Sequence, residues 1–233
     1  TGLPGAYIAD EQAAEELIDQ YEAAAKDGPV FLHMVTMQNH IPNLPGEYPA
    51  ADRVDARLDG IPDYYEQSLQ SVATGLRDAD RMMAQITEYF KSVDREVIVL
   101  FFGDHQTAIG QEEGIELLDI TGRLEGLSAA ERWQATHAVP YLMWSNRGCA
   151  QAGASAGSFP PYLLLPNFLH AFQAPRTAWF EWLYNSQSTL KGISGSYLLD
   201  PQSRIQTAPS EQQRSLLERQ ATLQYALMFD DAA

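Results

Sequence analysis

The chain has 233 residues, 45% of them hydrophobic and 20% charged, a composition typical of a soluble globular protein with one large domain or two small ones. Its formal net charge of −16 argues against nucleic acid or an anionic membrane surface as the main partner, because both favour Lys and Arg. The single cysteine, Cys149, excludes an internal disulfide framework.

The first predicted element is a helix over residues 10–26, with Asp10 as its N-cap and acidic side chains in its first turn. Residues 30–38, VFLHMVTMQ, are mostly apolar or β-branched and predict a buried strand. Residues 41–61 contain three prolines and Gly60, which predicts a long irregular loop. Loops of that length in compact domains are usually functional or disordered.

A long helix is predicted after Pro62. Apolar side chains recur there in steps of four and three residues, at Tyr65, Leu69, Val72, Leu76, Ala79, Met83, Ile86 and Phe90. A face of this regularity indicates core packing rather than contact with a cofactor.

Three further elements follow the long helix. Residues 96–105, EVIVLFFGDH, predict a central strand of a parallel sheet, because the apolar run is continuous up to Gly103. Ser128 and Glu131 have the spacing of a capping box and predict a short helix. Residues 139–146 predict a third strand, and this order of strands and helices is typical of a parallel α/β sheet with right-handed crossovers.

The predicted fold class is therefore α/β. Residues 1–154 form the α/β part, and residues 155–233 are predicted to be mostly helical, with Ser210 and Gln213 capping the last helix. No change in composition marks a second domain.

Polar residues follow all three predicted strands, at the place where open parallel sheets bind ligands, and two of these three strand ends include a histidine. Asn39 and His40 follow the first strand, and Asp104 and His105 follow the second. A carboxylate oxygen beside an imidazole nitrogen suits zinc or manganese, and Gly103 lets two successive side chains turn toward one centre. The alternative is a capped or hydrogen-bonded turn. Two ligands also fall short of the three or four that a metal site usually needs.

The other candidate residues have alternatives of the same kind. His40 could be a loop histidine that is hydrogen-bonded to the backbone, and His137 could face the site or cap a turn before the third strand. Cys149 follows Gly148 in a loop without a neighbouring base, which argues against a nucleophilic role. Walker, GxGxxG and GxSxG motifs are absent.

Several segments occur in a fixed order from about residue 30 to the C-terminus: VTMQNHIPN, YYEQSLQSVATGLRDAD, VIVLFFGDHQTAIG, HAVPYLMWSN and LQYALMFDD. Together they resemble the lipoteichoic acid synthase family, which are phosphoglycerol transferases of the alkaline phosphatase/sulfatase superfamily. The resemblance implies a three-layer α/β/α domain with a mainly parallel sheet. It also implies a position at the extracellular face of the cell membrane, with anchoring through upstream transmembrane segments.

The resemblance also implies roles for individual residues. The family uses a threonine nucleophile and a divalent cation, typically manganese, with zinc and magnesium as alternatives. Asp104 and His105 match its metal ligands, and His40 matches the histidine that contacts the phosphoglycerol head group. Asn39 and His137 are further candidates for substrate binding.

The family's nucleophilic threonine and its glutamate ligand have no counterpart here, so no catalytic nucleophile is expected in this chain. The start, TGLPGAYIAD, has neither an initiator methionine nor a signal peptide. We therefore expect residues 1–233 to be the C-terminal portion of a sulfatase-like catalytic domain whose N-terminal half is missing, which would expose a sheet edge.

The expected activity is metal-dependent transfer of phosphoglycerol from a lipid or a cell-envelope polymer. One alternative keeps the superfamily and changes the substrate, giving a sulfatase, a phosphodiesterase or a phosphoethanolamine transferase. A second alternative is of another class, since this chain by itself could be a non-catalytic α/β module that is inactive in isolation.

Overall fold

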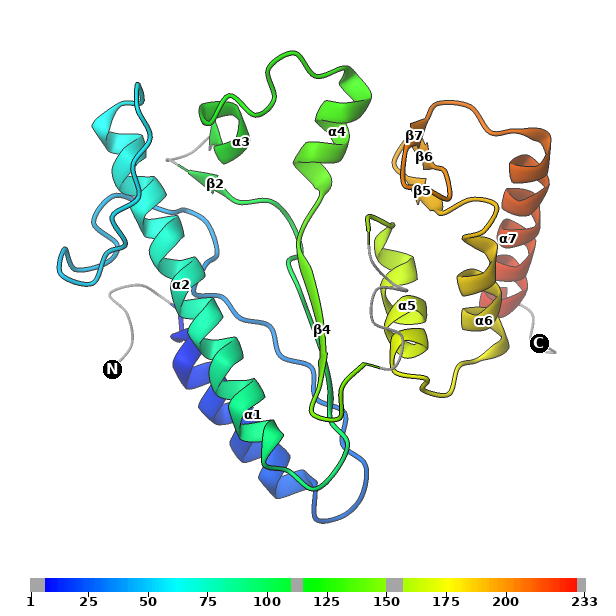
Figure 1. The fold of residues 1–233 in the computed structure, drawn as a ribbon, viewed down its shortest axis with the longest axis horizontal. Helices are drawn as coiled ribbons and strands as arrows, with labels where there is room; N and C mark the ends of the chain where they lie inside the picture. Colours follow the sequence, from blue (N-terminus) through cyan, green and yellow to red (C-terminus); the bar gives the residue numbers. More distant parts are fainter. Residues whose placement is uncertain (1–6, 110–114, 150–156, 230–233) are drawn as a thin grey trace. The chain divides into compact units, whose positions relative to one another are not determined.

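The computed structural model describes residues 7–109, 115–149 and 157–229 (Figure 1). The chain divides into two compact units. The first unit comprises Thr1–Val97, Gly103–Leu127 and Ala135–Val139, and the second comprises Ile98–Phe102, Ser128–Gln134 and Pro140–Ala233. Helices and strands both occur, as the predicted α/β class requires.

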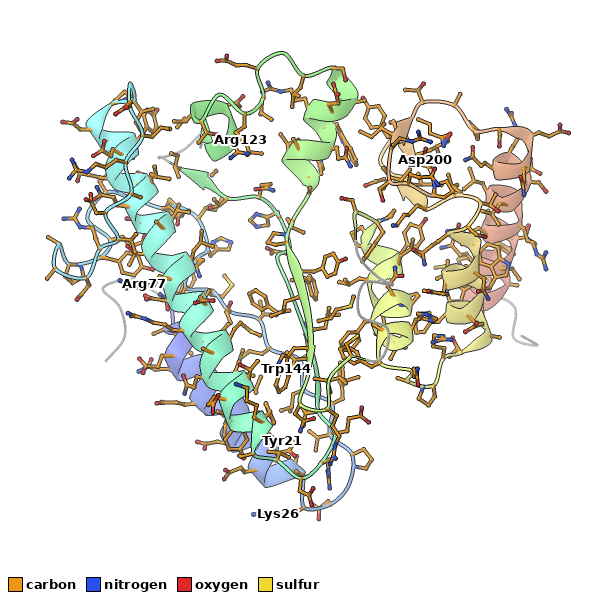
Figure 2. The ribbon with its side chains drawn as sticks, in the orientation of Figure 1. Tyr21, Lys26, Arg77, Arg123, Trp144 and Asp200 are labelled. Atoms are coloured by element: carbon orange, nitrogen blue, oxygen red, sulfur yellow. The ribbon has the colours of Figure 1, made fainter. Side chains whose placement is uncertain are left out.

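The first unit is built on two packed helices, α1 (Asp10–Ala24) and α2 (Asp63–Lys91), which confirm the two longest helices predicted in this part of the sequence. They lie side by side and run in the same direction (Figure 1). Tyr21 of α1, labelled in Figure 2, places its ring edge-on to Phe90 of α2 with 4.9 Å between centroids. The N-cap prediction was wrong, because Ala9 occupies the cap position and Asp10 is the first helical residue, with a wholly buried side chain.

The predicted buried strand over residues 30–38 is also wrong. This segment belongs to no strand or helix. Its apolar side chains are largely open to solvent, with Phe31 91% and Val35 68% exposed. A strand needs a neighbour to accept and donate its backbone hydrogen bonds, and within the described ranges this segment has no such ladder.

The predicted core face of α2 is correct at Val72 and in its C-terminal half, and wrong at Leu76. Val72, Met83, Ile86 and Phe90 are buried, whereas Leu76 is 62% exposed. Toward its N-terminus the helix also buries small or hydroxyl-bearing residues, namely Ser68, Ser71, Thr74 and Gly75.

This polar face receives the backbone of the long loop that precedes α2. The Ser71 hydroxyl donates a hydrogen bond to the carbonyl oxygen of Leu44 at 2.8 Å. The backbone N–H of Val54 donates to the Thr74 hydroxyl at 2.9 Å. Burying the hydroxyl groups is tolerated because each of these two has a partner.

The remaining elements of the first unit are short. Strands β2 (Ala108–Ile109) and β3 (Ile115–Glu116) pair antiparallel, and α3 (Leu117–Ile120) follows them. Helix α4 (Ala129–His137), whose residues up to Gln134 belong to the second unit, begins with the predicted capping box. The Ser128 hydroxyl donates to the Glu131 carboxylate at 2.7 Å, and the Glu131 N–H donates to the Ser128 hydroxyl at 3.3 Å.

In the second unit, β1 (Ile98–Phe102) and β4 (Tyr141–Ser145) confirm two predicted strands. They pair antiparallel, with Val99 opposite Trp144, and form a two-stranded sheet. The expected mainly parallel sheet is therefore not found among the described residues. The physical reason is that parallel pairing needs a further strand, and the segment over 30–38 does not form one.

The C-terminal part of the second unit consists of short packed elements. Its helical segments are η1 (Pro161–Leu163), α5 (Leu164–Ala171), α6 (Ala178–Ser186) and α7 (Glu211–Phe229). The predicted cap of α7 is present, since the Ser210 N–H donates to Gln213 Oε1 at 2.9 Å. An antiparallel sheet of β5 (Gly192–Ser194), β6 (Tyr197–Leu199) and β7 (Ile205–Gln206) was not predicted.

Crossing a bilayer takes a helix of about 20 apolar residues. None of the helices within residues 7–109, 115–149 and 157–229 meets that requirement.

Candidate metal and substrate site

Asn43 holds together the two loops that carry the principal candidate residues. Its side-chain amide donates hydrogen bonds to the Thr107 hydroxyl and to the Ala108 carbonyl oxygen, each at 3.0 Å. A parallel backbone bridge joins Asn43 to Ile109. The loop that begins at His40 is therefore fastened to the segment that follows His105.

Asn43 was missed by the sequence analysis. It is buried, with 5% of its surface exposed, and its role depends on partners 64 and 65 residues away. The available signal was a polar amide at the end of the stretch QNHIPN, directly after Asn39, His40 and a proline. Such a residue could equally have been part of an exposed turn.

A third loop is tied to the same place by Gln106. Its side-chain amide donates to the carbonyl oxygen of Ala138, which follows His137. Three stretches that lie far apart in the sequence, residues 40–43, 104–108 and 137–138, are therefore linked within the first unit.

The Asp104–His105 pair has a geometry that suits two ligands of one metal ion. The His105 Nδ1 lies 2.8 Å from the carbonyl oxygen of Gln106, which can only accept, so Nδ1 carries the proton. This leaves Nε2 with its lone pair, 3.6 Å from Oδ2 of Asp104. With metal bonds of about 2.0–2.1 Å, tetrahedral ligand atoms are about 3.4 Å apart. A backbone carbonyl that fixes the other ring nitrogen is also the usual arrangement behind a metal-bound histidine.

The hydrogen-bonded turn that was the alternative interpretation of these residues is also observed. The other carboxylate oxygen of Asp104, Oδ1, accepts the His105 N–H at 3.0 Å, so the side chain caps its own turn. One oxygen thus shapes the turn while the other faces the imidazole. The two interpretations of the GDH stretch are compatible.

The metal site is chemically suitable but incomplete in the part of the chain that is described. Both side chains are open to solvent, 83% for Asp104 and 54% for His105. Across residues 7–109, 115–149 and 157–229, no group of three or more His, Cys, Asp or Glu side chains is placed to hold a metal ion. One or two further ligands would have to come from outside this set.

His40 is exposed, and its ring is fixed at one nitrogen. Its Nδ1 donates to the carbonyl oxygen of Ile41 at 2.7 Å, which leaves Nε2 for a ligand. The ring of Tyr7 lies 5.8 Å away between centroids. The predicted backbone hydrogen bond of a loop histidine is therefore present together with a nitrogen that can bind substrate.

The two weaker substrate candidates have protein partners. The Asn39 amide donates to the Asp10 carboxylate at 3.2 Å. The His137 Nδ1 lies 3.0 Å from the Thr136 hydroxyl. The substrate-binding roles assigned to these residues, and the metal-binding role of the Asp104–His105 pair, stay predictions.

Comparisons with known proteins bear on the fold and the site. The model of a protein family described as Sulfatase matches residues 2–174. The chain is similar to a protein named "Putative cyclic beta-1,2-glucan modification protein" from Rhizobium meliloti (strain 1021), with 28% identity over 148 residues. The aligned region covers 61% of this chain and 22% of that relative, so the chain corresponds to a small part of it. No solved structure matches the chain.

Proposed function

The chain belongs to the sulfatase family, and on that basis we propose that it forms part of a metal-dependent phosphoglycerol transferase. The donor in this proposal is a phosphoglycerol lipid, and the acceptor is a hydroxyl group of a cell-envelope glycan. The lipid donor follows from the resemblance of the QNH and GDH stretches to phosphoglycerol transferases. The glycan acceptor is suggested by the relative, whose name describes modification of a cyclic glucan.

The observation that carries the proposal is the pair of hydrogen bonds from Asn43. They hold the loop of His40 against the loop of Asp104 and His105. An imidazole that can donate to an anion thus lies on a loop that is hydrogen-bonded to the loop of a carboxylate–imidazole pair that can hold a cation. Phosphodiester chemistry needs both functions at one place, because negative charge must be bound in the substrate and stabilised as it shifts during transfer.

A divalent cation held in part by Asp104 and His105 would supply positive charge near the phosphoryl oxygens and favour an oxygen nucleophile. Manganese is the cation proposed first, with zinc and magnesium as alternatives. His40 binds the head group, since its Nε2, when protonated, donates a charge-assisted hydrogen bond to a phosphate or glycerol oxygen.

The transfer takes place in two displacements. In the first, a bond forms between phosphorus and a nucleophile oxygen while the bond to the lipid alcohol breaks, and diacylglycerol leaves with a proton. In the second, the acceptor hydroxyl oxygen bonds to phosphorus while the bond from phosphorus to the nucleophile oxygen breaks, and the acceptor's proton returns to the nucleophile. The resemblance assigns the nucleophile to a threonine that this chain does not contain. The extracellular face of the membrane is the proposed place of the reaction, because the family that the chain resembles acts there.

The test uses a protein in which these 233 residues are joined to the upstream part of the domain. Phosphatidylglycerol and cyclic β-1,2-glucan are supplied with manganese or with EDTA. Diacylglycerol release and a phosphodiester ³¹P signal on the glucan are measured. Both products should require metal, His105 and His40. His33→Ala is the matched control, because His33 is an exposed histidine of the same unit.

A sulfate ester is the competing substrate, because the matching family is described as Sulfatase. Metal-dependent hydrolysis of p-nitrocatechol sulfate without diacylglycerol release would replace the transferase by a sulfatase while keeping the Asp104–His105 site. Turnover of a phosphomonoester or of phosphatidylethanolamine would point to the phosphatase or phosphoethanolamine branches. If no substrate were turned over, the chain would be a non-catalytic α/β module.

A further inference from the structure

The first turn of α1 contains a buried acid, Asp10, that forms no ion pair with the described residues. One carboxylate oxygen of Asp10, Oδ2, accepts a hydrogen bond from the Asn39 amide at 3.2 Å. The other, Oδ1, is buried without a partner in the part of the chain that the structure describes. The backbone N–H of Asp10 donates to Oε1 of Gln38 at 2.6 Å. The helix thus binds the two residues that directly precede His40.

Asp78 of helix α2 and Tyr48 of the loop before it also hold Gln38. The Gln38 amide donates to Oδ2 of Asp78 at 3.0 Å and to the Tyr48 hydroxyl at 3.2 Å. The second oxygen of Asp78 accepts from Arg77, labelled in Figure 2, at 2.8 Å. Gln38 is 4% exposed, so these hydrogen bonds are shielded from water.

Gly75 of α2 makes room for the Asn39 side chain. A Cβ atom at Gly75 would lie 1.7 Å from Oδ1 of Asn39 and 2.9 Å from its Cγ. No side chain fits there unless Asn39 moves. Glycine in the middle of a helix is unfavourable by itself, so its presence here has a packing reason.

Gln38 and Asn39 are the central residues of a tight turn. The His40 N–H donates to the carbonyl oxygen of Met37 at 3.0 Å across this turn. Fixing both central side chains fixes the backbone from which the His40 ring projects.

We propose that Asp10 and Gly75 are positioning residues for His40, acting through Asn39, and that the protonation state of Asp10 controls how firmly the turn is held. The functional meaning of this device rests on the proposed function, in which His40 binds the phosphoglycerol head group. Asn39 then acts on the substrate through His40, because its amide is engaged by Asp10.

The electrostatic surroundings make Asp10 responsive to pH. Burial and, second, the Asp78 carboxylate raise the pKa of Asp10 to about 6, against the lowering effect of the Asn39 hydrogen bond. The charged and titratable groups around it are Asp78 with its partners Arg77 and Arg81, together with Tyr48 and Glu47. An ionised carboxylate accepts a stronger hydrogen bond than a neutral one. Asn39 should therefore be held more firmly above about pH 6 and more loosely below it.

The test is an NMR experiment on the chain of 233 residues. The His40 ring signals and their contact with the Tyr7 ring are followed in wild type, Asp10→Asn and Gly75→Ala. Both variants should shift the His40 signals and weaken the contact with Tyr7. Ser68→Ala is the control, because it removes a buried hydroxyl of α2 that has no partner among the described residues. Unchanged His40 signals in both Asp10→Asn and Gly75→Ala would overturn the proposal.

The pH response is read from the Asn39 side-chain amide in a His40→Ala background, so that no imidazole at position 40 contributes. The amide signals should move with a midpoint near pH 6, and Asp10→Asn should abolish this transition. A transition that survives Asp10→Asn would overturn the proton control. The double variant of Asp10→Asn with Asn39→Asp exchanges the two side chains, so that position 10 has the amide donor and position 39 has the carboxylate acceptor. The His40 signals should lie closer to wild type in the double variant than in Asp10→Asn alone.

Binding of glycerol 3-phosphate separates this proposal from the proposed function. If wild type binds it, Asp10→Asn and Gly75→Ala should weaken binding about tenfold, the equivalent of one lost polar contact. Equal affinity in wild type and both variants would overturn the positioning role. If wild type binds none, the head-group role of His40 fails, while the ring signals still decide the positioning role.

Discussion

Replacing Asn43 by alanine tests whether this one side chain holds the two loops of the site together. The change removes two hydrogen bonds of 3.0 Å to Thr107 and Ala108, from an amide that is 5% exposed. Each bond contributes about 0.5–1.5 kcal/mol, and an acceptor left unpaired in a buried place costs more. Because Thr107 and Ala108 are half-buried, water can replace part of the loss. The expected destabilisation of the loop junction is about 2 kcal/mol, or about a 30-fold change in its opening equilibrium.

Amide hydrogen exchange is the appropriate assay for this prediction. All four tryptophans lie in the second unit, at Trp133, Trp144, Trp179 and Trp182, so tryptophan fluorescence would not report on the first. The backbone amides of β2 should exchange about 30-fold faster in Asn43→Ala when exchange is limited by the opening equilibrium. Gln20→Ala is the control, because the Gln20 amide is exposed and, among the described residues, bonds only to Glu16 in the same helix. If the two variants change the exchange of β2 equally, Asn43 does not hold the loops.

Four further outcomes are expected. Met82→Ala should destabilise the first unit by about 2–5 kcal/mol, because Met82 is 1% exposed. Met82→Leu keeps most of the side-chain volume and should cost less than about 1.5 kcal/mol. Exchange of the α2 amides measures both changes, and equal effects would contradict the packing argument. Thr74→Ala should speed exchange of the Val54 amide about fivefold through loss of its acceptor, while Thr74→Ser should leave it near wild type. Micromolar manganese should hardly change the melting temperature, because a site with two protein ligands binds a metal ion weakly. A large rise in the melting temperature that His105→Ala removes would show that further ligands exist in this chain. The free energy of unfolding of the first unit should fall as the pH rises from about 4 to about 6, because the folded state binds the Asp10 proton more tightly than the unfolded state does. The expected loss is about 3 kcal/mol. Exchange of the α1 amides measures it, and Asp10→Asn should lack this part of the pH dependence.

The sequence indicated which residues are candidates for the site, but not which hydrogen bonds hold them in place. The Asp104–His105 pair and His40 could be named because a carboxylate and an imidazole after an apolar run are visible in the sequence. Their fixed ring nitrogens could not be foreseen, since the partners are backbone carbonyl oxygens whose direction depends on local turns. Asn43 could not be recognised because its partners lie 64 and 65 residues away.

The polar face of α2 shows a related difference between sequence and structure. The apolar spacing correctly predicted Met83, Ile86 and Phe90 as core residues. It failed at Leu76, because the buried face of this part of the helix packs against a loop. The Ser71 hydroxyl donates to a backbone carbonyl oxygen of this loop, and the Thr74 hydroxyl accepts from one of its backbone N–H groups. Hydrophobic periodicity indicates where apolar side chains could be buried, but not which partner a helix receives.

The sequence by itself determined the positions of the helices α1, α2, α4 and α7 and of the strands β1 and β4. Helical hydrogen bonds and caps such as Ser128 with Glu131 join residues three or four positions apart, so local sequence specifies them. Tertiary structure decided which strands pair and in which direction. Residues 30–38 have the composition of a strand, yet a strand forms only when another segment completes its backbone hydrogen bonds, and that depends on contacts distant in sequence.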